Sequence, residues 1–217
     1  MLAGQRLVAD DGYEVCLFPF EYLYMSQDEG GDYSHAGTYN IDLLGWGANG
    51  KVYQCPFYAP CTLRCVAIWD ATNNNRVYQS AHKVHFADGT LNYLTICFAH
   101  DDNPPYSIGD TIQQGQLLGR TGTYGNVTGD HTHTCCGKGV YLGYTQRQPN
   151  GNYDLTNRCH YWDACYVNNT TIVQGYSHNW KTYSISPVPI NTGNSNFNFI
   201  LFGRNKKRYK FGKRTNI

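Results

Sequence analysis

Short runs of aromatic, β-branched and other apolar residues follow one another along most of this chain, and turn-forming residues bound each run. Such runs are typical of β-strands joined by tight turns. Asp88-Gly89 lies between two of them, and this dipeptide is a strong hairpin signal. The pattern therefore predicts an all-β, antiparallel domain. The expected strands are Tyr13–Pro19, Lys51–Tyr58, Thr62–Asp70, Arg76–Ala87, Thr90–Ala99, Thr111–Arg120, His131–Cys136, Ile172–Gln174 and Phe197–Phe202.

Composition supports this interpretation and excludes several classes of protein. Aromatic residues make up 15% of the 217 residues, which excludes disorder throughout the chain. Charged residues are also only 15%, too few for a coiled coil. No stretch of eighteen apolar residues is present to span a membrane. Asp10 and Asp11 stand where a secretory signal needs its apolar centre, so we expect no signal peptide in this segment.

Charge is divided unevenly along the chain. Residues 203–217 hold seven of the 17 basic residues and no acid, while the rest carries ten bases and 16 acids, a net charge of −6. A basic tail suits a polyanionic partner. Teichoic acid, nucleic acid and anionic lipid all fit, and so does a tail that only keeps the chain soluble. We expect a boundary near residue 190, with a folded domain over 1–190 and a strand and basic tail over 191–217.

The nine cysteines form no C-x-x-C pair, which argues against a zinc ribbon or a thioredoxin-type centre. We interpret them mainly as buried free thiols, with one or two disulfides as the alternative.

Three histidine contexts point to chemistry. His35 and Asp42 lie in SHAGTYNIDLLGWG, His100 ends an apolar run, and His131 and His133 are separated by one residue. In a strand, residues i and i+2 project from the same face about 6.5–7 Å apart, so two imidazoles can reach one ion and its water. Two histidines and one carboxylate are a normal ligand set for catalytic Zn²⁺, which activates water and polarises a carbonyl.

Several segments resemble the LytM/lysostaphin-type zinc metallopeptidases, a family of cell-wall endopeptidases. The likeness covers roughly residues 33–136 and is most specific from Gly109 to His133. The matching segments, in family order, are His35-Ala36-Gly37; Tyr58-Ala59-Pro60 with Thr62–Val66; Tyr93–His100; Gly109-Asp110-Thr111 with Gln114–Gly119; and Thr121-Gly122, Thr128-Gly129 and His131-Thr132-His133.

This resemblance implies a fold, a cofactor and a set of site residues. The fold would be an antiparallel β-sheet or β-sandwich of the LytM, or duplicated hybrid motif, type with long surface loops. His35, Asp42 and His133 would bind one Zn²⁺ per chain. His100 and His131 would be the catalytic pair for hydrolysis of an amide by zinc-activated water. His82, His85, His160 and His178 match no family position, and we expect them to be surface or hydrogen-bonded imidazoles.

One departure concerns the acidic ligand. The family places Asp four residues after the first histidine, where this chain has Tyr39, so Asp42 follows at seven. A spacing of seven needs a bulge or turn, which Gly37 could supply, and Asp32 is the alternative ligand. The longer spacing resembles tail-tip or lysin peptidases of small podophages that infect Gram-positive bacteria. Their delivery by the virion or during lysis would account for a missing signal peptide.

The sequence thus predicts a peptidoglycan endopeptidase of a phage tail or lysin. The alternatives are a catalytically inactive LytM-like wall-binding or virion module, and a non-enzymatic β module that binds cell-wall polymer and in which the histidines are incidental. Expected partners are peptidoglycan and, through the basic tail, a wall polyanion or other tail proteins. The resemblance identifies neither the bond cleaved nor the host.

Overall fold

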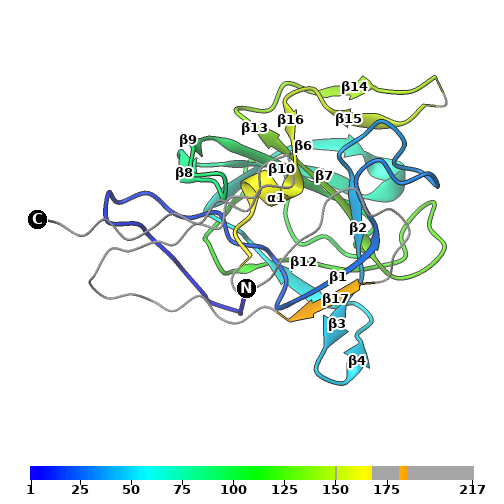
Figure 1. Ribbon diagram of the computed structural model, residues 1–217, viewed down its shortest axis with the longest axis horizontal. Helices are drawn as coiled ribbons and strands as arrows, with labels where there is room; N and C mark the ends of the chain where they lie inside the picture. Colours follow the sequence, from blue (N-terminus) through cyan, green and yellow to red (C-terminus); the bar gives the residue numbers. More distant parts are fainter. Residues whose placement is uncertain (150, 168–180, 185–217) are drawn as a thin grey trace, which may run out of the picture.

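A computed structural model describes residues 1–149, 151–167 and 181–184 (Figure 1). Almost all regular structure in this part of the chain is β, and every strand pairing is antiparallel. The first elements are β1 (Tyr22–Gln27), β2 (Ile41–Leu43), β3 (Trp46–Gly47), β4 (Gly50–Lys51), β5 (Pro56–Tyr58), β6 (Leu63–Asp70), η1 (Ala71–Asn73), β7 (Asn75–Ser80), β8 (Val84–His85) and β9 (Leu91–Asn92). They are followed by β10 (Leu94–Phe98), β11 (Thr111–Ile112), β12 (Leu117–Arg120), β13 (Thr132–Lys138), β14 (Tyr144–Gln146), β15 (Tyr153–Leu155), β16 (Arg158–Cys159), α1 (Tyr161–Ala164) and β17 (Lys181–Ser184).

One large sheet organises the molecule. Its strands lie in the order β11-β6-β7-β10-β13-β2-β1-β17, and β16 also pairs with β13. β10 is central, pairing with β7 on one side and β13 on the other. Within the described residues, no helix is long and apolar enough to cross a membrane.

Alternation along β10 and β13 divides the apolar residues between the two faces of the sheet. Ile96 and its partner Cys136 face the main core, which also contains Phe57 of the small β5–β12 sheet. Phe57 stacks on Phe98 of β10, with ring centroids 4.6 Å apart, so the small sheet forms a second layer on this face. The opposite face packs Val77, Cys97, Cys135 and Leu155.

The predicted antiparallel β fold is confirmed, with corrections to individual strands. Tyr13–Pro19 is not a strand: its residues make single bridges to separate segments, so no ladder forms. The expected strand Lys51–Tyr58 is broken around Gln54, which has a left-handed φ of 49°, and Thr111–Arg120 is broken around Gly115, with φ 84°. The Asp88-Gly89 turn joins two-residue strands, β8 and β9. Ile172–Gln174 and residues 191–217 lie outside the described residues.

The sequence patterns missed the strands β1 and β2, which border the site. β1 alternates between half-buried and buried residues, and Leu23, Met25 and Gln27 face inward. A glutamine at an inward position obscured the apolar alternation.

All nine cysteines are free thiols, and eight are buried, as the main interpretation expected. Cys97 and Cys135 lie opposite each other on β10 and β13 with their Sγ atoms 3.1 Å apart. Cys135 shares a strand face with His133 and packs in the apolar cluster with Val77, Cys97 and Leu155.

Candidate metal centre

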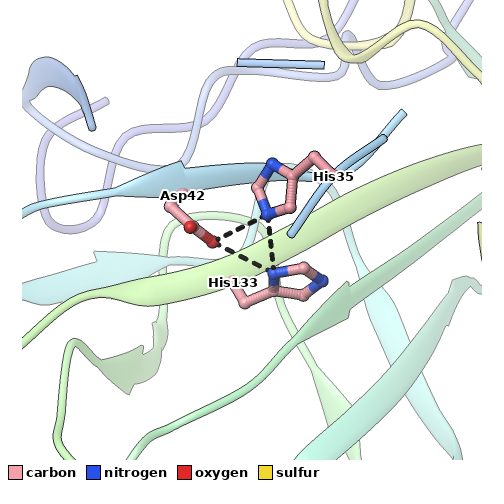
Figure 2. Close-up of side chains that lie close together, drawn as sticks. All are labelled: His35, Asp42 and His133. Carbon is pink, nitrogen blue, oxygen red and sulfur yellow. Dashed lines mark hydrogen bonds and ion pairs between the residues drawn. The ribbon is translucent and has the colours of Figure 1, made fainter. Parts of the chain in front are cut away.

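Two neighbouring strands bring Asp42 and His133 together. In the register of β2 and β13, His133 lies directly opposite Asp42. Because cross-strand neighbours share a face of the sheet, their side chains meet, and His133 Nδ1 lies 3.0 Å from Asp42 Oδ1 (Figure 2). Backbone pairing alone therefore places these two side chains.

His35 reaches the same point from the loop before β2. Its side chain is fully buried, and its Nε2 lies 3.3 Å from Asp42 Oδ1 and 3.2 Å from His133 Nδ1 (Figure 2). Its Nδ1 lies 3.2 Å from the carbonyl oxygen of Asp28. Since a carbonyl only accepts, Nδ1 carries the hydrogen and the Nε2 lone pair faces the site.

The irregularity expected between His35 and Asp42 is present. Gly37 has a left-handed φ of 73°, and the amide of Thr38 donates to the carbonyl of His35, so the chain turns back. Asp32, the alternative acid, is exposed and does not belong to the cluster. The structure thus brings together the three side chains that the resemblance implied as ligands.

The donor set fits Zn²⁺. Within the described part of the chain, His35, Asp42 and His133 form the group of histidine and acidic side chains able to hold a metal, with ligand atoms within 4.8 Å of one another. Tetrahedral zinc with bonds of about 2.0–2.1 Å places its ligand atoms about 3.3–3.4 Å apart. The three observed separations, 3.0 to 3.3 Å, are close to that spacing. Two imidazole nitrogens and a carboxylate oxygen at this spacing need shared protons or a cation between them.

The electrostatics of Asp42 favour its ionised form. Burial alone would raise the pKa of this carboxyl, but hydrogen bonds and charge attraction from His133 and His35 hold it well below its usual value. Its second oxygen, Oδ2, accepts a hydrogen bond of 2.9 Å from Gln27 Nε2. The pKa of His133 shows the reciprocal effect: burial lowers it, and Asp42 raises it above its usual value.

Gln27 is a site residue that the sequence reasoning missed. It links Asp42 to the histidine loop, because its Oε1 accepts from the amide of Ser34 at 3.0 Å and its Nε2 contacts Ser34 Oγ at 2.9 Å. The available signal was a polar side chain at the inward position of an alternating strand.

His100 and His131 lie beside the three candidate ligands. Their ring centroids are 4.7 Å apart, and His131 Nε2 lies 3.7 Å from Asp42 Oδ1. Each Nδ1 faces a backbone carbonyl, that of Tyr124 at 2.9 Å for His100 and that of Gly129 at 2.8 Å for His131. Both rings are therefore held with Nδ1 as the donor, which leaves Nε2 as the free base.

The backbone at His100 is unusual. Its φ of 74° is left-handed, a conformation that non-glycine residues adopt mainly at functional or strained positions. Its amide donates to the carbonyl of Asn73 at 2.8 Å, and its carbonyl accepts from the amide of Tyr124 at 3.2 Å. Burial, followed by the nearby His131, lowers the pKa of His100 to about 4, so this imidazole is neutral at pH 7.

A cleft of about 720 Å³ opens over these groups. Its lining includes Asp42, His100, His131 and His133 as well as the aromatic side chains of Tyr33 and Trp69. A molecule in this cleft can thus contact the candidate metal centre and both additional imidazoles.

The remaining histidines that fall within the described residues match expectation. His85 pairs with Asp11 at 2.8 Å, His160 pairs with Glu29, and His82 is exposed. His178 lies outside the described residues.

Comparison with known proteins identifies a phage protein as a relative of this chain. No family model matches the chain. Over 173 residues it is 34% identical to morphogenesis protein 1 of Bacillus phage B103, an alignment that covers 79% of this chain and 45% of the phage protein. The chain therefore spans about half the length of this curated relative.

Similar solved structures include a zinc-containing peptidase from Vibrio cholerae, at 16% identity and a TM-score of 0.42 over 60% of this chain and 42% of that one. The catalytic domain of lysostaphin from Staphylococcus simulans gives 17% identity and a TM-score of 0.40, covering 57% of this chain and 84% of that one. A prophage-encoded M23 protein from Enterococcus faecalis gives 18% identity and a TM-score of 0.39, covering 60% of this chain and 86% of that one. The chain is thus a relative of a phage morphogenesis protein, and it brings together the two histidines and the aspartate that its resemblance to the LytM/lysostaphin-type zinc peptidases implies as ligands.

Proposed function

We propose that this chain is a zinc-dependent endopeptidase that hydrolyses an amide bond in peptidoglycan peptides or cross-bridges. The observation that carries the proposal is the convergence of His35 Nε2, Asp42 Oδ1 and His133 Nδ1 beneath an open cleft, with two further imidazoles beside them. His35, Asp42 and His133 would hold one Zn²⁺, which would supply activated water at neutral pH and polarise the scissile carbonyl.

His100 and His131 would carry out the proton transfers. Each presents a free Nε2 to the cleft because its Nδ1 hydrogen is engaged by a backbone carbonyl. A neutral imidazole can take a proton from attacking water and return it to the leaving amine, and once protonated it can stabilise the oxyanion. The low pKa of His100 keeps it in the accepting form at neutral pH.

The setting that we propose is a phage virion tail or lysin. The support is the 34% identity to a phage protein named for morphogenesis and the podophage-like spacing of His35 and Asp42. The partners would be peptidoglycan and, through residues 203–217, a wall polyanion or another tail protein.

A second candidate is a catalytically inactive virion module with the same fold. The name of the phage relative favours it, since a morphogenesis protein can have a purely structural role. The five side chains expected for catalysis argue against it, because an inactive domain has no need for a converging ligand set and two oriented bases.

Two measurements on the purified chain decide between the candidates. The first is metal content, for which we expect about one Zn²⁺ per chain. The second is a digest of purified cell wall with the released fragments identified by mass, which also identifies the bond cleaved. Stoichiometric zinc with release of peptide fragments supports the enzyme, whereas absence of both supports the structural module.

A further inference from the structure

The loop that follows His35 is contacted by residues that lie outside the matched family motifs of residues 33–136. Residues 36–40, which connect His35 to β2, receive contacts from a segment more than a hundred residues later in the chain. The Asn152 side chain donates to the carbonyl of Ala36 at 3.2 Å, and the Asn40 side chain donates to the carbonyl of Tyr153 at 2.9 Å. The loop thus packs against β15 and the residues around it.

Asp154 lies at the centre of this contact. Its side chain is completely buried, and its Oδ2 accepts a 2.6 Å hydrogen bond from the backbone amide of Tyr39. Its Oδ1 accepts from the amide of Leu155 at 2.8 Å. A buried carboxylate is costly unless it is paired, and here Arg158 supplies the pairing charge, with its Nη1 3.3 Å from Asp154 Oδ2.

Arg158 holds the same loop at two further points. Its Nη1 donates to the carbonyl of Gly37 at 2.6 Å, and its guanidinium lies 4.1 Å from the centre of the Tyr39 ring. The Tyr39 ring also stacks on His160, at a centroid distance of 4.1 Å, and Glu29 pairs with His160. Polar contacts therefore fix both the turn at Gly37 and the residue that stands where the related peptidases have their aspartate.

The spacing of His35 and Asp42 in the sequence explains why the loop between them needs these contacts. Seven residues of extended strand would carry Asp42 about 23 Å from His35. The observed separation of their ligand atoms is 3.3 Å, so the intervening chain must fold back and keep that shape. A turn that contains a left-handed glycine has many alternative conformations when nothing restrains it.

We propose that Asp154 and Arg158 are positioning residues for the metal centre, fixing residues 37–39 so that His35 and Asp42 meet. This inference rests on the proposed function, because it assigns the two residues a role in zinc affinity. Outer partners of metal ligands typically contribute about 10–100-fold in affinity.

The test compares three variants in zinc affinity and in stability. Arg158→Ala removes the contacts with Gly37 and the Tyr39 ring, and Asp154→Asn weakens the contact with the amide of Tyr39. Arg147→Ala is the matched control, because this arginine also belongs to the β14–β15 region but donates to the carbonyls of Leu155 and Thr156, not to the histidine loop. Zinc affinity is measured by competition with a chromophoric chelator, metal geometry by the visible spectrum of the Co²⁺-loaded protein, and stability by urea unfolding of the metal-free chain.

We expect Arg158→Ala and Asp154→Asn to weaken zinc binding by about 10–100-fold and to alter the Co²⁺ spectrum, while Arg147→Ala stays within about 2-fold of wild type. If Asp154→Asn does not fold, the zinc affinity of Arg158→Ala is compared with that of Arg147→Ala, and this comparison alone tests the positioning role. Wild-type zinc affinity in a folded Arg158→Ala protein would overturn the positioning role and leave the proposed enzyme intact. A wild-type chain that binds no zinc would overturn the proposed function itself, and this role with it.

Discussion

The two halves of the candidate metal centre are built in different ways. Asp42 and His133 lie on adjacent strands of the large sheet, and the ladder between β2 and β13 sets their relative position. His35 lies in a loop that is fixed by side chains outside it. Gln27, seven residues away, binds Ser34, and the distant Asp154 and Arg158 bind residues 39 and 37. β2 and β13 are inner strands of the large sheet, whereas β14 and β15 form a separate two-stranded sheet, at the top of Figure 1, whose Leu155 packs against Cys97 and Cys135.

The two halves should therefore differ in how well they tolerate substitutions. A ligand placed by strand register keeps its position as long as the sheet is folded, because a slip would move every side chain of the strand to the other face. A ligand placed by side-chain contacts can be displaced by local changes that leave the sheet intact. The strand half should thus respond to substitution of the ligand itself, and the loop half also to substitution of its supports.

The largest effect is expected from the carboxylate ligand. Asp42→Ala removes the one oxygen that faces both His35 and His133, so bound zinc should fall from about one per chain to near zero and activity should be lost. Metal analysis and circular dichroism of the purified variant test this.

The control for that prediction is Asp32→Ala, since Asp32 is exposed and outside the cluster. It should retain zinc and activity. Zinc retained in Asp42→Ala but lost in Asp32→Ala would show that the ligand had been assigned to the wrong acid.

A smaller effect should follow replacement of either additional histidine. His100→Ala or His131→Ala removes a proton-transfer group, but three protein ligands remain, so zinc should stay bound while turnover falls by about 10²-fold or more. Turnover on wall fragments and metal content are measured on the same preparation. Zinc loss as severe as in His133→Ala would make these residues ligands.

The sheet itself can be weakened without touching the site. Ile96 is completely buried in the main core, on the face of β10 opposite Cys97, and Ile96→Val removes one methylene group. We expect a loss of about 0.5–1.5 kcal/mol in the free energy of unfolding. The zinc affinity of the folded variant should be unchanged, because register places Asp42 and His133. A tenfold weaker zinc affinity in the folded protein would refute the idea that strand register alone places Asp42 and His133.

The same division explains what the sequence could predict. The shared location of His131 and His133 was predictable, because residues two apart in a strand project from the same face of the sheet. The flanking motif pointed to the residues that lie beside them. Asp42 was predictable only as a departure from a motif. The approach of His35 to Asp42 depends on the turn at Gly37 and on contacts from residues 152–158, which local periodicity does not report.

The missed features share that physical cause. β1 was missed because Gln27 occupies an inward position, where its side chain binds Asp42 rather than packing in the core. Tyr13–Pro19 was overpredicted because its buried apolar residues lack a continuous partner strand. Pairing partners and long-range hydrogen bonds are tertiary properties, and single-strand patterns carry no information about them.

The smallest effect is expected from the basic tail, residues 203–217, which should influence neither half of the metal centre. We predict that replacing its seven lysines and arginines with glutamine weakens binding to purified Gram-positive cell wall a few-fold at low salt, because that wall is polyanionic. Near 1 M salt the difference should vanish, since the Debye length falls from about 10 Å at 0.1 M to about 3 Å. Hydrolysis of a small soluble peptide should not change at either salt concentration.

A tail with the same residues in scrambled order is the matched control, because it keeps the charge and alters only the sequence. If charge alone attracts the wall, the scrambled chain should bind like wild type at low salt and the glutamine chain should not. If both variants lose binding equally, the wall recognises the order of the tail residues and not their charge alone. Equal wall binding by all three chains at low salt would refute the role of the tail in wall attachment, and binding to another virion protein would then be the better explanation of its charge.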